Sequence, residues 1–191
     1  MDMTGQRTLQ VTQQQVWEAL NDPEILKACI PGCQKFEPSG NQKFAVAAGI
    51  KMGPVSALFN GSVQLTDIVA PQSYKLNFDA QGGVAGFGKG EAAVEIKPLE
   101  KGCELHYTVH SSVGGKIAQL GQRLIDGVAK NMAEDFFKRF EAELEKRYPP
   151  VPEPLSLGSA PVPNQASSGL PAWMWGLGLV VVVAAVAIAY L

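Results

Sequence analysis

The sequence predicts an α+β fold of the helix-grip type, in which a curved antiparallel sheet of about seven strands is closed by one long helix. Two patterns of apolar residues carry this prediction. Through much of the first 113 residues they recur at every second position, as in half-buried strands. Beyond Gly114 and Gly115 they recur every third or fourth position, as in an amphipathic helix. An uncharged apolar run over the last twenty residues predicts a separate membrane-spanning helix.

The first thirty residues predict one strand and two short helices. The strand precedes Val11, and Thr12 then offers a helix N-cap that Gln15 completes as a capping box. Asp22 and Pro23 begin a second helix, with Asp at the N-cap and Pro at the first helical position. The loop at residues 29–32 ends that helix, because it contains Pro and Gly.

The middle of the chain predicts an antiparallel meander followed by the long helix. Turn residues such as Gly53-Pro54 and Lys101-Gly102 separate the segments that alternate. The apolar stripe of the helix, from Ile117 to Leu144, must lie on one face of the sheet. The expected strands span residues 33–37, 44–52, 55–66, 74–80, 88–96 and 103–113.

Small residues are frequent among the side chains that the strands are expected to point inward. A fully packed core needs larger side chains at most of these positions, so the pattern favours an apolar cavity that suits an apolar ligand. The alternative is that the glycines curve the sheet and let the helix approach closely. The loops at residues 30–32 and 82–87 are candidate rims. The expected cavity lining is Ala57, Phe59, Gly61, Phe78, Gly88, Ala92, Tyr107, Leu120, Gly121 and Leu124.

The sequence offers no clear catalytic or metal-binding group. His106 and His110 are expected on the polar face of the sheet, about 13 Å apart along one strand. The three cysteines form an odd number in a chain without an export signal, which indicates free thiols. The basic and acidic residues of the first 147 positions nearly balance, which argues against nucleic-acid binding. Binding is therefore favoured over catalysis.

The chain divides into three parts by composition. Residues 1–147 form the domain, and residues 148–171 contain seven of the thirteen prolines and predict a flexible linker. Residues 172–191 carry no charge and as a helix would rise about 30 Å, enough to span a bilayer. Because the N-terminus does not resemble a signal peptide, we expect a tail anchor with the domain on the cytoplasmic side of the cell membrane.

Three motifs resemble the family of carbon monoxide dehydrogenase G subunits, which belongs to the START-like (SRPBCC) superfamily. They are Val16-Trp17-Glu18-Ala19-Leu20-Asn21-Asp22-Pro23-Glu24, then Cys29-Ile30-Pro31-Gly32-Cys33, and the glycine-flanked stretch from Gly114 to Gly127. The resemblance covers roughly residues 1–147. The START-like superfamily is one of hydrophobic-ligand binders. The resemblance therefore agrees with the helix-grip fold and the apolar cavity expected from the patterns.

The resemblance implies a non-catalytic accessory protein. It would recruit a molybdenum hydroxylase of the carbon monoxide dehydrogenase type to the cytoplasmic membrane. It would also handle a quinone, menaquinone or ubiquinone, or another lipid, with no covalent or metal cofactor. Two alternatives stay open from the sequence: a membrane docking module without a ligand, and a START-like enzyme.

Overall fold

The structure is a computed structural model that describes residues 1–149. Within these residues the chain forms seven strands, three α-helices and two short 3-10 helices. The strands are β1 (Asp2–Leu9), β2 (Cys33–Gly40), β3 (Lys43–Met52), β4 (Val55–Val69), β5 (Ser73–Gln81), β6 (Phe87–Pro98) and β7 (Cys103–Gly114). The helices are α1 (Gln13–Leu20), α2 (Pro23–Cys29), η1 (Gly83–Ala85), η2 (Ala118–Leu120) and α3 (Gln122–Arg147).

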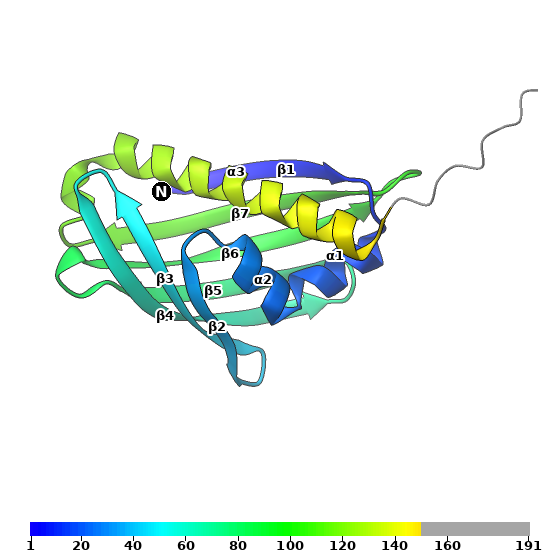
Figure 1. Cartoon of the computed structure of the whole chain (residues 1–191), viewed down its shortest axis with the longest axis horizontal. Helices are drawn as coiled ribbons and strands as arrows, with labels where there is room; N and C mark the ends of the chain where they lie inside the picture. The colour runs from blue at the N-terminus through cyan, green and yellow to red at the C-terminus, as the bar shows by residue number, and fades with distance from the viewer. Residues whose placement is uncertain (150–191) are drawn as a thin grey trace, which may run out of the picture. The chain divides into compact units, whose positions relative to one another are not determined.

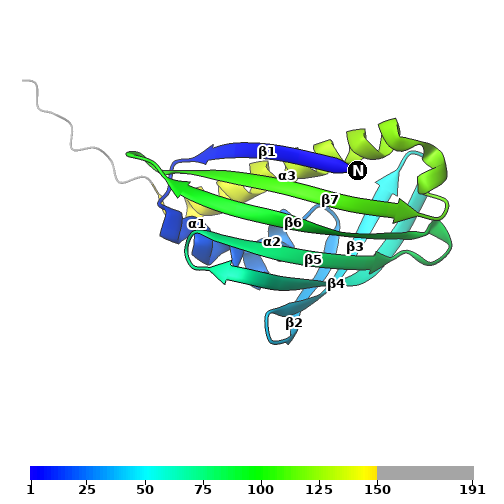
Figure 2. The same cartoon turned by 180° about the vertical axis from the view of Figure 1, so that it is seen from behind.

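All seven strands pair antiparallel in one sheet of order β1-β7-β6-β5-β4-β3-β2. The helix α3 crosses in front of this sheet, and α1 and α2 lie on the same side (Figure 1). Seen from behind, the opposite face of the sheet lies in front of the helices (Figure 2). The predicted seven-stranded sheet and closing helix are thus confirmed for the described residues.

The predicted starts of both short helices are also confirmed. The Thr12 side chain accepts a hydrogen bond from the backbone N–H of Gln15, and the Gln15 side chain accepts one from the backbone N–H of Thr12. Asp22 caps α2 through the backbone N–H of Glu24, and Pro23 occupies the first helical position. These bonds satisfy amide groups that a helix leaves unpaired at its N-terminus.

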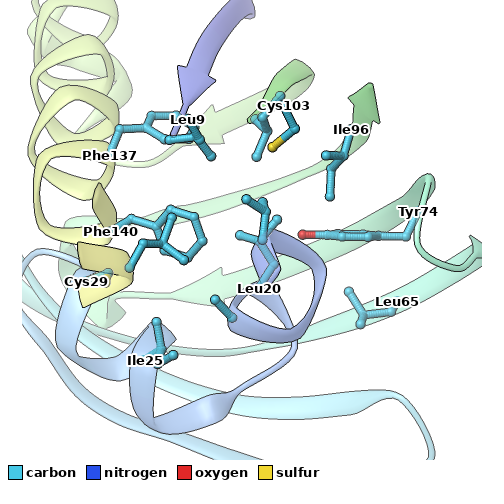
Figure 3. Packing of buried hydrophobic residues seen from close by; sticks show 14 residues of the cluster. Leu9, Leu20, Ile25, Cys29, Leu65, Tyr74, Ile96, Cys103, Phe137 and Phe140 are labelled. Atoms are coloured by element: carbon cyan, nitrogen blue, oxygen red, sulfur yellow. The ribbon is translucent and has the colours of Figure 1, made fainter. Parts of the chain in front are cut away.

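The main hydrophobic core lies between the sheet and the three helices (Figure 3). Phe140 of α3 is fully buried and points toward Leu20 of α1. Phe137 lies one turn earlier, on the same side of α3 as Phe140. The sheet contributes Leu9, Ile96 and other inward residues, so each helix is held mainly by packing.

The long helix begins later than its apolar pattern predicts. The expected stripe started at Ile117, but residues 118–120 form a 3-10 turn and α3 begins at Gln122. Gly121 lies between the two with φ = 88°, a left-handed conformation that glycine adopts without strain. Ile117, the first residue of the predicted stripe, therefore lies outside the helix and is buried in a second, smaller cluster.

The second cluster joins β4, the loop between β5 and β6, and the segment before α3. Its buried members are Phe59 of β4, Ala85 of η1 and Ile117. The backbone N–H of Ile117 donates a 3.0 Å hydrogen bond to the carbonyl of Ala85, which ties the chain before α3 to the loop between β5 and β6.

Among residues 1–149 no helix is long and apolar enough to cross a membrane. The predicted linker, apart from its first two residues, and the predicted tail anchor lie outside the described residues.

Candidate ligand cavity

An apolar cavity of about 280 Å³ lies between the sheet and the helices. This volume is just below the usual range of ligand pockets, roughly 300–1,000 Å³. The cavity therefore has room for one ring-sized group. Its lining is Leu20, Leu26, Ile30, Phe36, Phe44, Val63, Leu65, Tyr74, Leu76, Phe78, Val94, Leu105, Tyr107, Phe136 and Phe137.

Tyr74 and Tyr107 bring the only polar side-chain atoms among these lining residues. Their strands place them in one row of the sheet, since Tyr74 pairs with Val94 and Val94 pairs with Tyr107. Both rings lie on the helix-covered face, two strands apart, which corresponds to roughly 10 Å between their Cα atoms.

Tyr74 is 6% exposed, and its hydroxyl points into the interior (Figure 3). Its ring meets the ring of Trp17 edge-on, with 5.7 Å between centroids. Burial raises the pKa of Tyr74, so the hydroxyl stays protonated at physiological pH. Among the described residues this hydroxyl has no hydrogen-bond partner.

Tyr107 is oriented differently. Its ring stacks on Phe137 of α3, with 5.3 Å between centroids and 27° between planes. Its hydroxyl lies over Gly5 of β1, where a Cβ atom would overlap it. Gly5 does not line the cavity, so the ring of Tyr107 forms a wall while its hydroxyl is directed toward β1.

Arg7 is an inward-facing charge that the apolar patterns did not predict. It pairs with Leu105 in the sheet and lies beneath α3, where it forms an ion pair with Glu134. Its guanidinium lies 5.4 Å from the ring centroid of Phe137, and the Glu134 carboxylate raises the pKa of Arg7. Among the described side chains its Nε is buried without a hydrogen-bond partner. Side chains two residues apart on a strand lie on the same face of the sheet. Because Leu9 points inward, Arg7 could have been expected to point inward as well.

Of the ten residues predicted to line a cavity, the structure places Phe78 and Tyr107 on this one. Ala57 and Phe59 belong to the second cluster instead. Leu124 is 40% exposed on the first turn of α3. The others lie outside the lining: Gly61, Gly88 and Ala92 on inward strand positions, and Leu120 and Gly121 before α3.

For Gly61 the structure gives a physical reason, which also applies to Gly90, another inward glycine, on β6. A Cβ atom on Gly61 would overlap the carbonyl oxygen of Asp79 on β5, and one on Gly90 would overlap that of His110 on β7. The neighbouring strand already occupies the space that these glycines leave. At these two positions the small residues serve close strand packing and curvature, which was the alternative considered from the sequence.

The two candidate rim loops lie at different places. Ile30, at the C-terminal cap of α2, lines the cavity. The loop at residues 82–87 instead contacts the second cluster, and its Val84 side chain is 85% exposed.

The histidines and cysteines do not contribute to the cavity lining. The Nε2 atom of His106 lies 2.7 Å from the Glu104 carboxylate, and the Nδ1 atom of His110 lies 2.7 Å from the Asp2 carboxylate. Both histidines are on the face of the sheet opposite the helices. Burial raises the pKa of Cys29 and of Cys103 to about 11. Within residues 1–149 no group of His, Cys, Asp and Glu side chains is arranged to hold a metal ion.

A sheet gripped by a long C-terminal helix over an apolar cavity defines a START-like (SRPBCC) domain. The sequence matches the family model of the carbon monoxide dehydrogenase G subunit (CoxG) over residues 5–145. The chain belongs to this family.

Solved structures share the fold, and one of them is also similar in sequence. A conserved protein from Geobacillus kaustophilus is 36% identical, with a TM-score of 0.73, and the match covers 76% of this chain and 96% of that one. A protein from Thermus thermophilus is 15% identical, with a TM-score of 0.60 and coverage of 78% and 99%. The Zhui aromatase/cyclase from a Streptomyces species is 13% identical, with a TM-score of 0.55 and coverage of 77% and 94%.

The last two relatives share the fold alone with this chain, because their identities are low. Among curated proteins no sequence matches with significance.

Proposed function

We propose that this protein is a membrane-anchored accessory protein of a molybdenum hydroxylase of the carbon monoxide dehydrogenase type. It recruits that enzyme to the cytoplasmic membrane and binds a quinone, or a similar lipid, in its apolar cavity. The quinone then couples the enzyme to the respiratory chain. The single observation that carries the ligand-binding part is the apolar cavity between α3 and the sheet.

The lining of the cavity supports binding of an apolar ring. Aromatic and aliphatic side chains surround it, including Phe36, Phe44 and Phe136. Its volume of about 280 Å³ suits a headgroup rather than a whole isoprenoid quinone, so the tail of such a ligand would extend beyond the cavity.

The family supports the choice of partner. The family name, which describes a G subunit of carbon monoxide dehydrogenase, associates its members with that enzyme complex. The resemblance of the motifs around Trp17, Pro31 and Gly121 carries the same expectation for this chain.

The composition of the tail supports the membrane location. Residues 172–191 are uncharged, and Trp173 and Trp175 stand at their upstream end, where indole rings favour the membrane interface. A helix of this length matches the hydrocarbon core of a bilayer. The Pro-rich stretch before it would give the domain reach toward a soluble enzyme.

The chemistry of the lining supports a binding protein over an enzyme. No lining side chain of the cavity is a carboxylate, an imidazole or a thiol. The burial-raised pKa of Tyr74 makes its hydroxyl a poor general base near neutral pH. The aromatase/cyclase relative shares the fold without sharing enough sequence to carry its activity over.

Membrane recruitment is tested by fractionation. The full-length chain and a variant that ends at residue 149 would each be expressed beside the hydroxylase, and hydroxylase activity measured in the membrane and soluble fractions. The proposal predicts hydroxylase in the membrane fraction only with the full-length chain. Equal distribution with both forms would contradict the recruiting role, whereas recruitment by a variant with a filled cavity would favour a docking module without a ligand.

A further inference from the structure

The hydroxyl of Tyr74 is an unpartnered polar group inside an otherwise apolar cavity. The side chain is 6% exposed, its oxygen points into the interior (Figure 3), and none of the described residues accepts or donates a hydrogen bond to it. The oxygen is not fully enclosed by protein atoms, since among the described residues only the Nε of Arg7 is both fully enclosed and unpartnered. The hydroxyl therefore borders the space of the cavity, where an oxygen or nitrogen atom of a bound molecule can pair with it.

The other hydroxyl of the lining is directed elsewhere. Tyr107 stands in the same row of the sheet, with Val94 between the two tyrosines. Its oxygen lies over Gly5 of β1, next to a separate small pocket formed with Arg7 and Glu134. Among the residues that line the cavity, Tyr74 thus presents the one polar side-chain atom that is free to contact a molecule within it.

We propose that the Tyr74 hydroxyl is the group that selects and orients the ligand, by a hydrogen bond to an oxygen atom on an otherwise apolar ring. This inference rests on the proposed function, because it assumes that the cavity of about 280 Å³ holds a ring-sized group. It adds the requirement that the ring carries an oxygen.

The chemistry of a phenol suits a ligand that has an oxidised and a reduced form. A tyrosine hydroxyl can donate one hydrogen bond and accept others, and it rotates to suit its partner. It can therefore donate to the carbonyl of an oxidised quinone and accept from the hydroxyl of the reduced quinol. A lysine or arginine could only donate. A single Tyr74 contact thus accommodates both forms of a ligand whose oxygen changes from acceptor to donor.

The test compares two compounds of the same ring skeleton. Menadione carries two carbonyl oxygens on a methylnaphthalene ring, and 2-methylnaphthalene carries none. Binding to the full-length chain would be followed through the methyl NMR signals of the cavity residues Leu65 and Val63. The ratio of the two dissociation constants is the measured quantity, and partition into detergent cancels when this ratio is compared between variants.

Two variants complete the design. Tyr74→Phe removes only the cavity hydroxyl. Tyr148→Phe is the matched control, because its hydroxyl contacts Glu18 on the surface at 3.2 Å. We expect Tyr74→Phe to weaken menadione binding about 3- to 10-fold and to leave 2-methylnaphthalene unchanged. The control variant Tyr148→Phe should keep the wild-type ratio.

Other outcomes overturn the inference. Equal affinity of the wild-type chain for both compounds would show that the cavity does not recognise oxygen, and this comparison needs no variant. A Tyr74→Phe variant that keeps the wild-type ratio would give the selectivity to another group. Either result leaves the proposed cavity standing, since the compounds bind. Failure of both compounds to bind would instead overturn the proposed ligand binding, and this inference with it.

Discussion

Arg7 on the edge strand β1 lies against the face of Phe137 on α3, with 5.4 Å from the guanidinium carbon to the ring centroid. The ion-pair partner of Arg7 is Glu134, one turn earlier on the same helix. This contact joins the first strand of the chain to the helix α3, beside the wall that Tyr107 and Phe137 provide for the cavity.

The contact predicts unequal effects of removing its two charges. Arg7→Ala removes both the cation–π contact and the packing of the aliphatic stem, so we expect a loss of about 1–2 kcal/mol in the free energy of unfolding. Glu134→Ala removes a partner that is mostly exposed, and we expect less than about 1 kcal/mol. Urea unfolding followed by circular dichroism measures both. A larger loss for Glu134→Ala would contradict the packing role of Arg7.

Phe140 tests the packing of α3 on the sheet. The side chain is fully buried in the main core, so Phe140→Ala should lower the free energy of unfolding by about 3–5 kcal/mol. Leu124 on the same helix is 40% exposed, and Leu124→Ala should change the free energy of unfolding by no more than about 0.5 kcal/mol. Chemical denaturation of both variants gives the comparison. Similar losses would mean that the whole helix, rather than its C-terminal half, carries the packing.

Thr12 tests the capping box of α1. Thr12→Ala removes the oxygen that accepts from the backbone N–H of Gln15, and the expected loss is about 1 kcal/mol. Gln14→Ala is the control, since the Gln14 side chain donates only to the exposed side chain of Glu18. Thermal unfolding of the two variants should separate them. Equal melting temperatures would show that α1 is held by its packing alone.

The cysteines predict a pH effect with a definite sign. Burial raises the pKa of Cys29 and Cys103 to about 11, above the ordinary value of 9.0. In the folded state these thiols keep their protons where the unfolded chain loses them. Their contribution to stability is therefore complete below pH 9 and is lost as the pH rises through 11. Unfolding measured from about pH 8 to about pH 11 should show falling stability, and a Cys29→Ala/Cys103→Ala variant should show a weaker fall.

The same burial predicts the order of thiol labelling. At about pH 8 a thiol with a pKa of about 11 is roughly one part in a thousand thiolate, so Cys29 and Cys103 should react only when the chain unfolds. Cys33 is partly exposed, although burial raises its pKa as well, and should react first. Mass spectrometry after brief labelling of the folded chain identifies the modified residue. Early modification of Cys103 would contradict its burial in the main core.

The strand positions were predictable because one face of each strand is buried. The period of two fixes which side chains point inward, so residues such as Tyr74, Phe78 and Tyr107 could be assigned to the helix-covered face from the apolar pattern. The starts of α1 and α2 were predictable for a local reason, since Thr12 and Asp22 act within three residues of their own positions.

The start of α3 was not predictable from its apolar stripe. Ile117 and Leu124 are seven residues apart and fit one helical face, yet Gly121 interrupts the helix between them. A periodic pattern cannot show that the chain makes a turn between two such residues. The positive φ of Gly121 belongs to the turn that residues 117–121 make. In this turn the backbone N–H of Ile117 donates a hydrogen bond to the carbonyl of Ala85.

The position of the cavity was not predictable for a related reason. Small residues suggest empty space, but at Gly61 and Gly90 the space is filled by the backbone of the next strand. The cavity lies instead among large residues near α1 and α2, including Phe36 and Phe44. Its location depends on the separation of helix and sheet, which side-chain sizes along one strand do not determine.

The central claim, that the cavity between α3 and the sheet holds a quinone, is tested most directly by the mass of the co-purified ligand. The full-length chain would be purified from a quinone-producing host beside two variants. Val94→Phe fills the cavity between Tyr74 and Tyr107, and Leu124→Phe adds the same kind of ring at an exposed position outside it.

Extraction and mass spectrometry would then give the quinone bound per chain. We predict close to one quinone per chain for the wild type and for Leu124→Phe, and little or none for Val94→Phe. Equal quinone in all three proteins, or none in the wild type, would contradict the claim.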